Sequence, residues 1–130
     1  MTLREKQSKF AWMLVSLLTY MREQGYEVTF GDFWAFPFDA IIQLLERILV
    51  MTKFPGLKEV IKKLKTKRHH HSSCHYLRLA ADLNLFKDGK YMSKTSDHLI
   101  FGEFWESIGG TWGGRFNDGN HYSLEHNGRK

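Results

Sequence analysis

The pattern of hydrophobic positions divides the chain into a helical first half and a second half in which short strands predominate. Apolar residues recur at helical spacing over residues 3–24, from Phe38 to a break near Pro55, and from Leu57 to Leu64. Gly25 is a typical helix-stop residue, and residues 26–30 read as a short strand after it. The first half is therefore predicted to hold three helices and one strand.

The second half opens with an alternation of apolar and polar positions. From Leu79 to Phe86, a leucine-rich side alternates with a side that carries Asp82, which predicts a half-buried strand. The later predicted elements are a hairpin turn at 87–90, a helix capped by Ser96 and ending at Ser107, a glycine- and aromatic-rich loop at 109–120, and a last strand at 121–125. This order predicts an α+β fold, with N-terminal helices packed on one face of a small antiparallel sheet.

Composition favours one globular domain over residues 1–130. The chain is 42% hydrophobic and 15% aromatic, with two prolines, so it can bury a core and is not expected to be disordered. A single cysteine, Cys74, excludes an internal disulfide framework and a multi-cysteine zinc ribbon. The aromatic residues from Phe101 to Phe116 are interpreted mainly as core, with Trp112 as a candidate wall of a substrate groove.

The net charge of +5 favours an anionic partner, and nucleic acid, a membrane surface and an anionic cell-wall polymer all qualify. The basic segment 58–68 carries its lysines opposite an apolar stripe, as a solvated helix face does, and no nucleic-acid motif accompanies it. A nucleic-acid partner is therefore not expected. Holding the protein near an anionic wall is a milder hypothesis for this segment.

A signal peptide is one interpretation of residues 11–21, which are rich in apolar residues and follow a basic N-terminal stretch. This apolar segment is too short to span a bilayer and is not followed by a small-residue cleavage motif. Its spacing is that of an ordinary amphipathic helix. We expect no signal peptide, no membrane insertion and synthesis in a cytoplasm.

Three residues form a candidate metal site. A catalytic zinc needs three protein ligands and an open position, and His75, Asp82 and His121 supply suitable side chains. If their strands are neighbours, Asp82 and His121 can project from one face, and a metal would compensate the burial of the acid. The residues alone leave the alternative that Asp82 is hydrogen-bonded at a strand edge and both histidines lie on the surface.

Several linked motifs resemble the family of zinc D-Ala-D-Ala carboxypeptidases and L-alanyl-D-glutamate endopeptidases, and most of all its small phage endolysins. The pattern is Ser-x-His, four residues, Ala-x-Asp at 73–82, followed by Asp-x-x-His at 118–121. The similar strings are RLAADLNLF (78–86), DGKY (88–91), GEFW (102–105), GGTWGGRF (109–116) and DGNHYSLEH (118–126). The likeness is close over 73–130 and loose over the first thirty-odd residues.

The resemblance implies one Zn²⁺ per chain, held by His75, Asp82 and His121, with Asp118 as the catalytic base. Asp118 would take a proton from water and pass it to the leaving amine. Ser73 is a candidate for orienting a metal ligand, with a solvated loop serine as the alternative. The fold implied is that of the DD-peptidase and hedgehog-like domains.

The sequence departs from the subgroup at the segment 33–37, where Ala35 stands in place of an expected arginine. That arginine is thought to meet the substrate carboxylate or the oxyanion, so its absence predicts reduced activity. Arg78 and Arg115 are candidates to replace the missing arginine. Together with Trp112, they are the predicted substrate-binding residues.

The segment of about 38–71 is longer and more apolar than this subgroup leads one to expect. It is either an inserted helical pair over the cleft or additional core, and we favour additional core. Its last residues, His69–His71, are interpreted as surface histidines rather than as a second metal cluster with Cys74.

These expectations define a monomeric zinc peptidase of peptidoglycan stem peptides, acting as a phage lysis enzyme that cuts between L-Ala and D-Glu. Made in the host cytoplasm, it would need a holin-like partner or cell breakage to reach the wall. One alternative is a D-Ala-D-Ala carboxypeptidase or dipeptidase with the same site. Another is a degenerate zinc- and wall-binding protein with weak activity.

Overall fold

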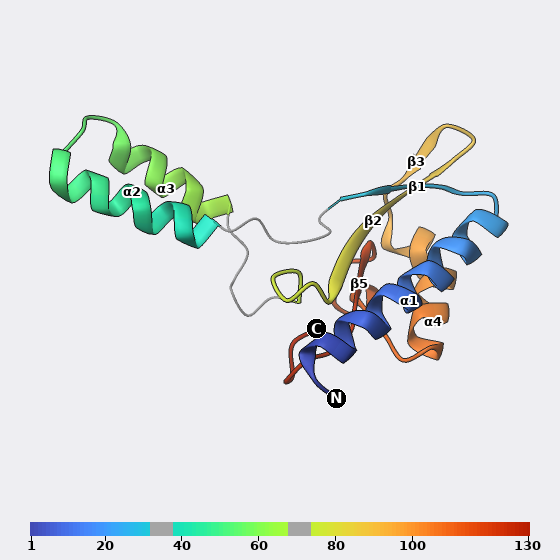
Figure 1. The fold of residues 1–130 in the computed structure, drawn as a ribbon. Coiled ribbons are helices and arrows are strands. Elements are labelled where there is room, and N and C mark those ends of the chain that lie inside the picture. The colour runs from blue at the N-terminus through green and yellow to red at the C-terminus, as the bar shows by residue number, and fades with distance from the viewer. Residues whose placement is uncertain (32–37, 68–73) are drawn as a thin grey trace.

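The computed structural model describes residues 1–31, 38–67 and 74–130, and its elements are helices and short antiparallel strands (Figure 1). In chain order they are α1 (Leu3–Glu23), β1 (Glu27–Phe30), α2 (Phe38–Thr52), α3 (Leu57–Lys67), β2 (Ala80–Lys87), β3 (Lys90–Met92), η1 (Thr95–His98), α4 (Leu99–Ser107), β4 (Thr111–Trp112), η2 (Gly113–Phe116) and β5 (His121–Ser123). The predicted α+β class is confirmed.

Helix α1 has well-formed ends. Thr2 and Glu5 form a capping box, in which the Glu5 amide donates to Thr2 Oγ1 at 3.2 Å and the Thr2 amide donates to Glu5 Oε2 at 2.7 Å. Gly25 follows the helix with a φ of 85°, a conformation that glycine adopts without steric cost. The predicted helix and its stop are thus confirmed to within one residue.

Strand β2 is the centre of the sheet. The strands run in the order β1-β2-β5-β4, and β3 also pairs with β2. Along β2, Ala81, Leu83 and Leu85 are buried, whereas Asp82 and Asn84 on the other face are partly exposed. This is the predicted alternation, and it gives the sheet an inner, apolar face and an outer, more polar one.

The main core lies between the inner face of the sheet and the helices α1 and α4. The two helices meet through aromatic side chains, with Phe10 edge-on to Trp105 at 5.7 Å between ring centroids and Tyr20 stacked on Phe104 at 4.8 Å. Tyr122 of β5 adds a further edge-on contact to Trp105. Of the aromatic residues predicted as core, Phe101 and Trp105 are buried and Phe104 packs against the core, but Phe116 is half exposed.

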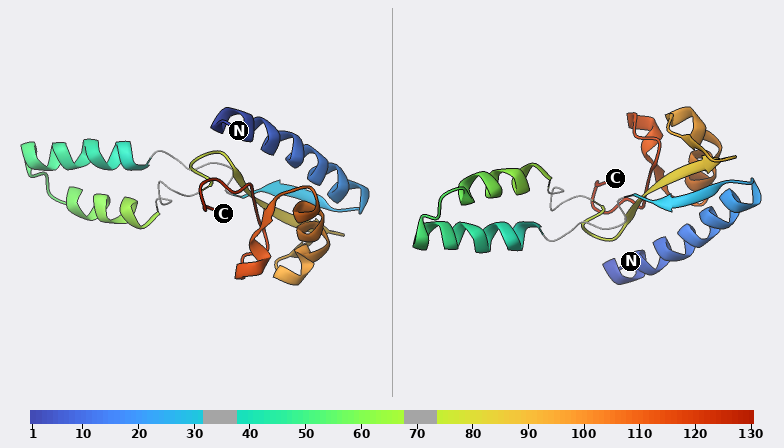
Figure 2. Two further views of the ribbon diagram at one scale, coloured as in Figure 1. Left: turned by 90° about the horizontal axis from the view of Figure 1, so that it is seen from below. Right: turned by 90° about the horizontal axis from the view of Figure 1, so that it is seen from above.

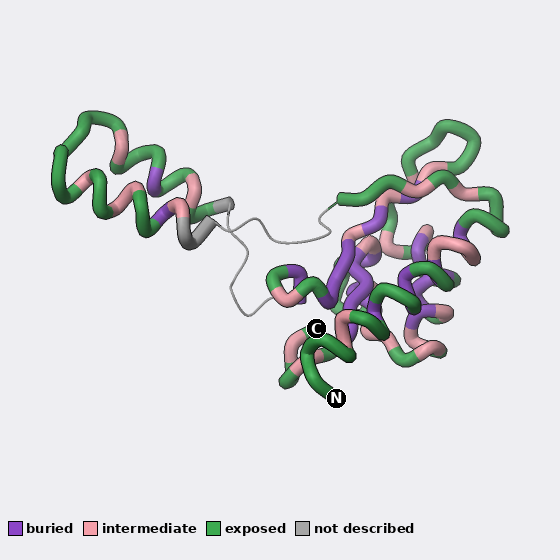
Figure 3. Tube along the Cα trace, in the orientation of Figure 1, coloured by how far each residue is buried: buried purple, intermediate pink, exposed green. Residues whose placement is uncertain are grey.

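Helices α2 and α3 form an antiparallel hairpin that lies apart from the sheet (Figures 1 and 2). They pack on each other, and Lys65 pairs with Glu46 across the hairpin at 2.7 Å. Among the described residues, the main core cluster includes no side chain from 38–67, and most of the hairpin is exposed (Figure 3). The prediction that this segment enlarges the core was therefore wrong, because its buried apolar side chains, Ile42 and Ile61, lie within the hairpin.

Smaller differences concern the second half. Ser96 does not cap α4; it lies inside the 3₁₀ turn η1, and the amide of Lys94, the residue before this turn, donates to Asp97 Oδ2 at 2.9 Å. The predicted loop at 109–120 contains the short strand β4 and the turn η2.

Within the described parts of the chain, no helix combines the length and the apolar character needed to cross a membrane. The predictions for Ala35, for the histidines at 69–71 and for Ser73 concern residues outside these parts.

Candidate metal centre

Two residues of the site come together through strand register. Asp82 of β2 lies directly opposite His121 of β5 in the antiparallel pairing. Directly opposed residues project from the same face, so both side chains lie on the outer face of the sheet. Leu83 and Leu124, their neighbours toward the core, are buried. The conditional prediction that these strands are neighbours is confirmed.

The third residue, His75, lies in the turn that precedes β2. The turn is closed by the amide of Arg78, which donates to the His75 carbonyl at 3.1 Å, and by the amide of Leu79, which donates to the Cys74 carbonyl at 2.8 Å. Cys74 is fully buried, and its thiol lies 3.8 Å from the Leu124 carbonyl. Burial raises the pKa of this thiol, so Cys74 anchors the turn as a neutral core residue.

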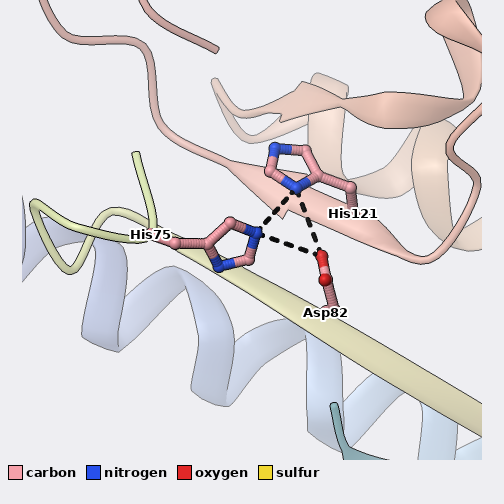
Figure 4. A group of neighbouring side chains, drawn as sticks. All are labelled: His75, Asp82 and His121. Carbon is pink, nitrogen blue, oxygen red and sulfur yellow. Dashed lines mark hydrogen bonds and ion pairs between the residues drawn. The ribbon is translucent and has the colours of Figure 1, made fainter. Parts of the chain in front are cut away.

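The three side chains converge on one point (Figure 4). His75 Nε2 lies 3.2 Å from His121 Nδ1 and 3.3 Å from Asp82 Oδ1, and His121 Nδ1 lies 3.2 Å from the same carboxylate oxygen. They form a group able to hold a metal ion, with one ligand atom from each residue. The alternative in which both histidines lie on the surface is excluded, because His75 and His121 are only 5% and 6% exposed.

The electrostatics of the group favour an ionised acid. Burial opposes ionisation of Asp82, but the hydrogen bonds from His121 and His75 outweigh it and lower the pKa of the carboxyl to about 2. At neutral pH Asp82 therefore offers an ionised carboxylate beside the two imidazole rings. This is a mixed nitrogen and oxygen set of the type that divalent transition metals bind.

The spacing of the ligand atoms also suits a small tetrahedral ion. Ligands at ~2.0–2.1 Å from a tetrahedral zinc lie roughly 3.3–3.4 Å from one another. The observed sides of the triangle are 3.2, 3.2 and 3.3 Å. A tetrahedral ion held by these three atoms would have a fourth ligand position left for another molecule.

Asp118 contacts His121 through the backbone and does not belong to the group. It occupies the turn that leads into β5, where its amide donates to the Gly113 carbonyl at 2.9 Å and its carbonyl accepts from the His121 amide at 3.1 Å. The residue is exposed. Sequence reasoning did not single out Gly113, yet a side chain there would overlap the Asp118 carbonyl and approach the His121 Cβ within 2.7 Å. Its closeness to His121 follows from the fold, since the two residues lie eight positions apart in the sequence.

None of the three predicted substrate residues belongs to the ligand group. Trp112 is 2% exposed and faces the core, because it pairs with Tyr122, which points to the face opposite that of His121. Its interpretation as a groove wall was therefore wrong. Arg115 is held by Glu106 at 2.7 Å, and Arg78 lines a groove of about 530 Å³ along α1 that also includes Phe10 and Leu14.

Comparisons of the chain with protein-family models, with curated proteins and with solved structures found no match. The candidate site therefore rests on its own geometry and on the motifs described above.

Proposed function

We propose that this protein is a zinc-dependent peptidase that hydrolyses the stem peptides of peptidoglycan. The observation that carries the proposal is the triangle of His75, Asp82 and His121, whose ligand atoms lie 3.2–3.3 Å apart. Family resemblance supplies the substrate class, since these three residues occupy the metal positions of the zinc carboxypeptidase and endopeptidase motifs. One zinc per chain is the expected stoichiometry.

The chemistry is divided between the metal group and Asp118. A bound zinc would polarise the scissile carbonyl and acidify a water molecule in the fourth position. Because the hydrogen bonds from the two histidines keep Asp82 ionised, a cation can bind the three residues without first displacing a proton from the acid. Asp118, exposed and three residues before His121, would accept the proton of the attacking water and transfer it to the leaving amine.

The bond most consistent with the motifs is that between L-Ala and D-Glu, as in phage endolysins of the resembled family. A D-Ala-D-Ala carboxypeptidase or dipeptidase would use the same residues on a different bond. Digestion of purified muropeptides followed by mass spectrometry separates them, because the first reaction frees the amino group of D-Glu and the second releases D-alanine.

Metal analysis of the purified chain, combined with a zymogram on purified cell walls, tests the proposal as a whole. We expect one zinc per chain, clearing of the wall, and loss of clearing after treatment with a chelator. Clearing that persists after the zinc is removed would contradict the proposed chemistry. Failure to bind zinc would exclude the site itself.

A second candidate is a zinc- and wall-binding protein with weak activity. One observation favours it: Arg115, a proposed substitute for the arginine absent at Ala35, has its guanidinium in a two-pronged ion pair with Glu106 at 2.7 and 3.2 Å. Bound zinc with no new amino termini in digested walls would favour this candidate over the peptidase.

A further inference from the structure

Helix α2 has two apolar faces, and only one is covered. The face that meets α3 includes Ile42, which is buried, as is Ile61 on α3. Leu44, Ile48 and Met51 are spaced four and three residues apart, so they form a stripe on the other side of the helix. All three side chains are exposed. An exposed apolar stripe of this length marks an interaction surface.

The stripe leads to the tip of the hairpin, which is the part of the molecule farthest from the sheet (Figures 1 and 2). Val50, Met51 and Phe54 at the tip are 79%, 84% and 64% exposed. Lys53 and Gly56 turn the chain there with φ values of 49° and 83°. Large apolar side chains are thus presented at the end of a projecting element, beside a lysine.

The positive charge of the protein is concentrated in the same element. Residues 38–67 hold seven basic and three acidic residues, whereas the rest of the chain holds twelve basic and eleven acidic residues. Nearly all of the net charge of +5 therefore belongs to the hairpin. Its lysines Lys58, Lys62 and Lys63 are exposed.

We propose that the α2–α3 hairpin is a docking surface for membranes that contain anionic phospholipids. Its apolar tip enters the boundary between headgroups and acyl chains, and its lysines meet the lipid phosphates. Charge complementarity selects this partner over a second copy of the chain, because two such hairpins repel each other. An anionic polymer or a nucleic acid would match the charge but leave the apolar tip in water.

The dimensions of the hairpin fit a surface position. Helix α2 has 15 residues, and at ~1.5 Å per residue it is roughly 22 Å long, shorter than the ~30 Å hydrocarbon core of a bilayer. The two helices lie side by side, so the hairpin reaches the membrane by its tip or along its stripe. This inference is independent of the proposed peptidase activity.

The test is sedimentation of the full chain with vesicles of phosphatidylcholine alone or of phosphatidylcholine mixed with phosphatidylglycerol. We expect binding to the anionic vesicles, little binding to the neutral ones, and weakening as salt rises. The double variant Met51→Ser/Phe54→Ser should bind at least about tenfold more weakly. Trp12→Ser, which removes another highly exposed aromatic side chain from α1, is the matched control and should bind as the parent does.

A charge variant, Lys62→Glu/Lys63→Glu, should also lose binding, whereas Lys90→Glu/Lys94→Glu outside the hairpin should retain most of it. Equal vesicle binding by the parent chain and by the Met51→Ser/Phe54→Ser variant would overturn the proposal. It would favour a site that binds polyanions by charge alone. Concentration-dependent dimerisation in sedimentation velocity, abolished by the tip variant without any vesicle binding, would instead identify a second copy as the partner. Circular dichroism of each variant shows that a loss of binding is not a loss of the helices.

Discussion

At the scale of single residues, the proposed chemistry assigns different roles to two acids. Asp82 lies within the strand pairing and shares an oxygen with both histidines, whereas Asp118 is exposed in the turn before His121. A ligand and a base respond differently to the same chemical change. Their roles can therefore be separated by matched aspartate-to-asparagine substitutions.

Asp118→Asn is expected to keep bound zinc and to lower the rate of muropeptide hydrolysis by about 10²- to 10⁴-fold, the usual contribution of a positioned general base. Asp82→Asn is expected to weaken zinc binding by more than the ~10- to 100-fold that follows loss of a group outside the ligand shell. Zinc content by atomic spectroscopy and initial rates on muropeptides measure the two effects. Loss of zinc in the Asp118 variant would show that the assigned roles are reversed.

A second residue-scale feature is the buried pair of His98 and Tyr122, which the sequence did not indicate. His98 Nδ1 lies 2.8 Å from the Tyr122 hydroxyl, and burial lowers the pKa of His98 to about 4, although Asp97 acts in the opposite direction. The unfolded chain binds this proton near pH 6.5, so the folded state loses stability as pH falls from about 6.5 to about 4. Above pH 6.5 the contribution of neutral His98 is complete.

His98→Gln, which cannot titrate, should flatten this dependence. Between pH 7 and pH 4.5 the parent chain is expected to lose about 2–3 kcal/mol more unfolding free energy than the variant. Urea unfolding at the two pH values measures the difference. Equal losses in both chains would mean that His98 is not the group responsible.

At the scale of elements, α4 and β4 depend on a close contact. Gly102 lies inside α4 with no side chain, and the Trp112 indole of β4 fills the space where one would stand. The indole nitrogen also donates to the Gly119 carbonyl at 2.7 Å, which ties this contact to the turn before β5. Helix, indole and turn therefore hold the segment that carries His121.

Gly102→Ala is expected to destabilise the fold by about 1–3 kcal/mol, since the added methyl group overlaps a buried ring that has no room to move. Glu103→Ala, at an exposed position of the same helix, is the control and should change stability by less than about 0.5 kcal/mol. Thermal or urea unfolding gives both values. A stable Gly102 variant would imply that Trp112 can be displaced from the core.

At the scale of the whole molecule, the apolar residues are buried in two separate places. One is the sheet with α1 and α4, called here the sheet domain, and the other is the α2–α3 hairpin. The main core cluster draws on α1, α4, the strands and the turn before β2, and includes no described residue of the hairpin. The two parts of the chain should therefore unfold with limited dependence on each other.

Replacing residues 38–67 by a short glycine-serine linker is expected to preserve zinc stoichiometry and the unfolding transition of the sheet domain. The two ends of the antiparallel hairpin lie close together, so a short linker can join them (Figure 2). Metal analysis and near-ultraviolet circular dichroism provide the measurements. Loss of the folded signal would show that the hairpin stabilises the domain through contacts with it.

Much of this protein was determined by local sequence. The alternation along 79–86 specified a strand with one polar face, and the spacing of α1 with its Gly25 stop specified a helix, because side-chain direction follows from backbone period alone. The three metal-ligand candidates were also identifiable, since their residue types and order resemble those of a known motif. Their convergence required that the strands carrying Asp82 and His121 be neighbours in the sheet, and the sequence alone does not establish this pairing.

Tertiary structure decided the rest. Only the pairing of β2 with β5 brings Asp82 opposite His121, and only the pairing of β4 with β5 turns Trp112 toward the core, because strand register fixes which residues share a face. The hydrophobic spacing of α2 and α3 is likewise compatible with two arrangements, in which the helices pack on the sheet or on each other. Which surface covers an amphipathic helix depends on the arrangement of the whole chain, and hydrophobic periodicity does not specify it.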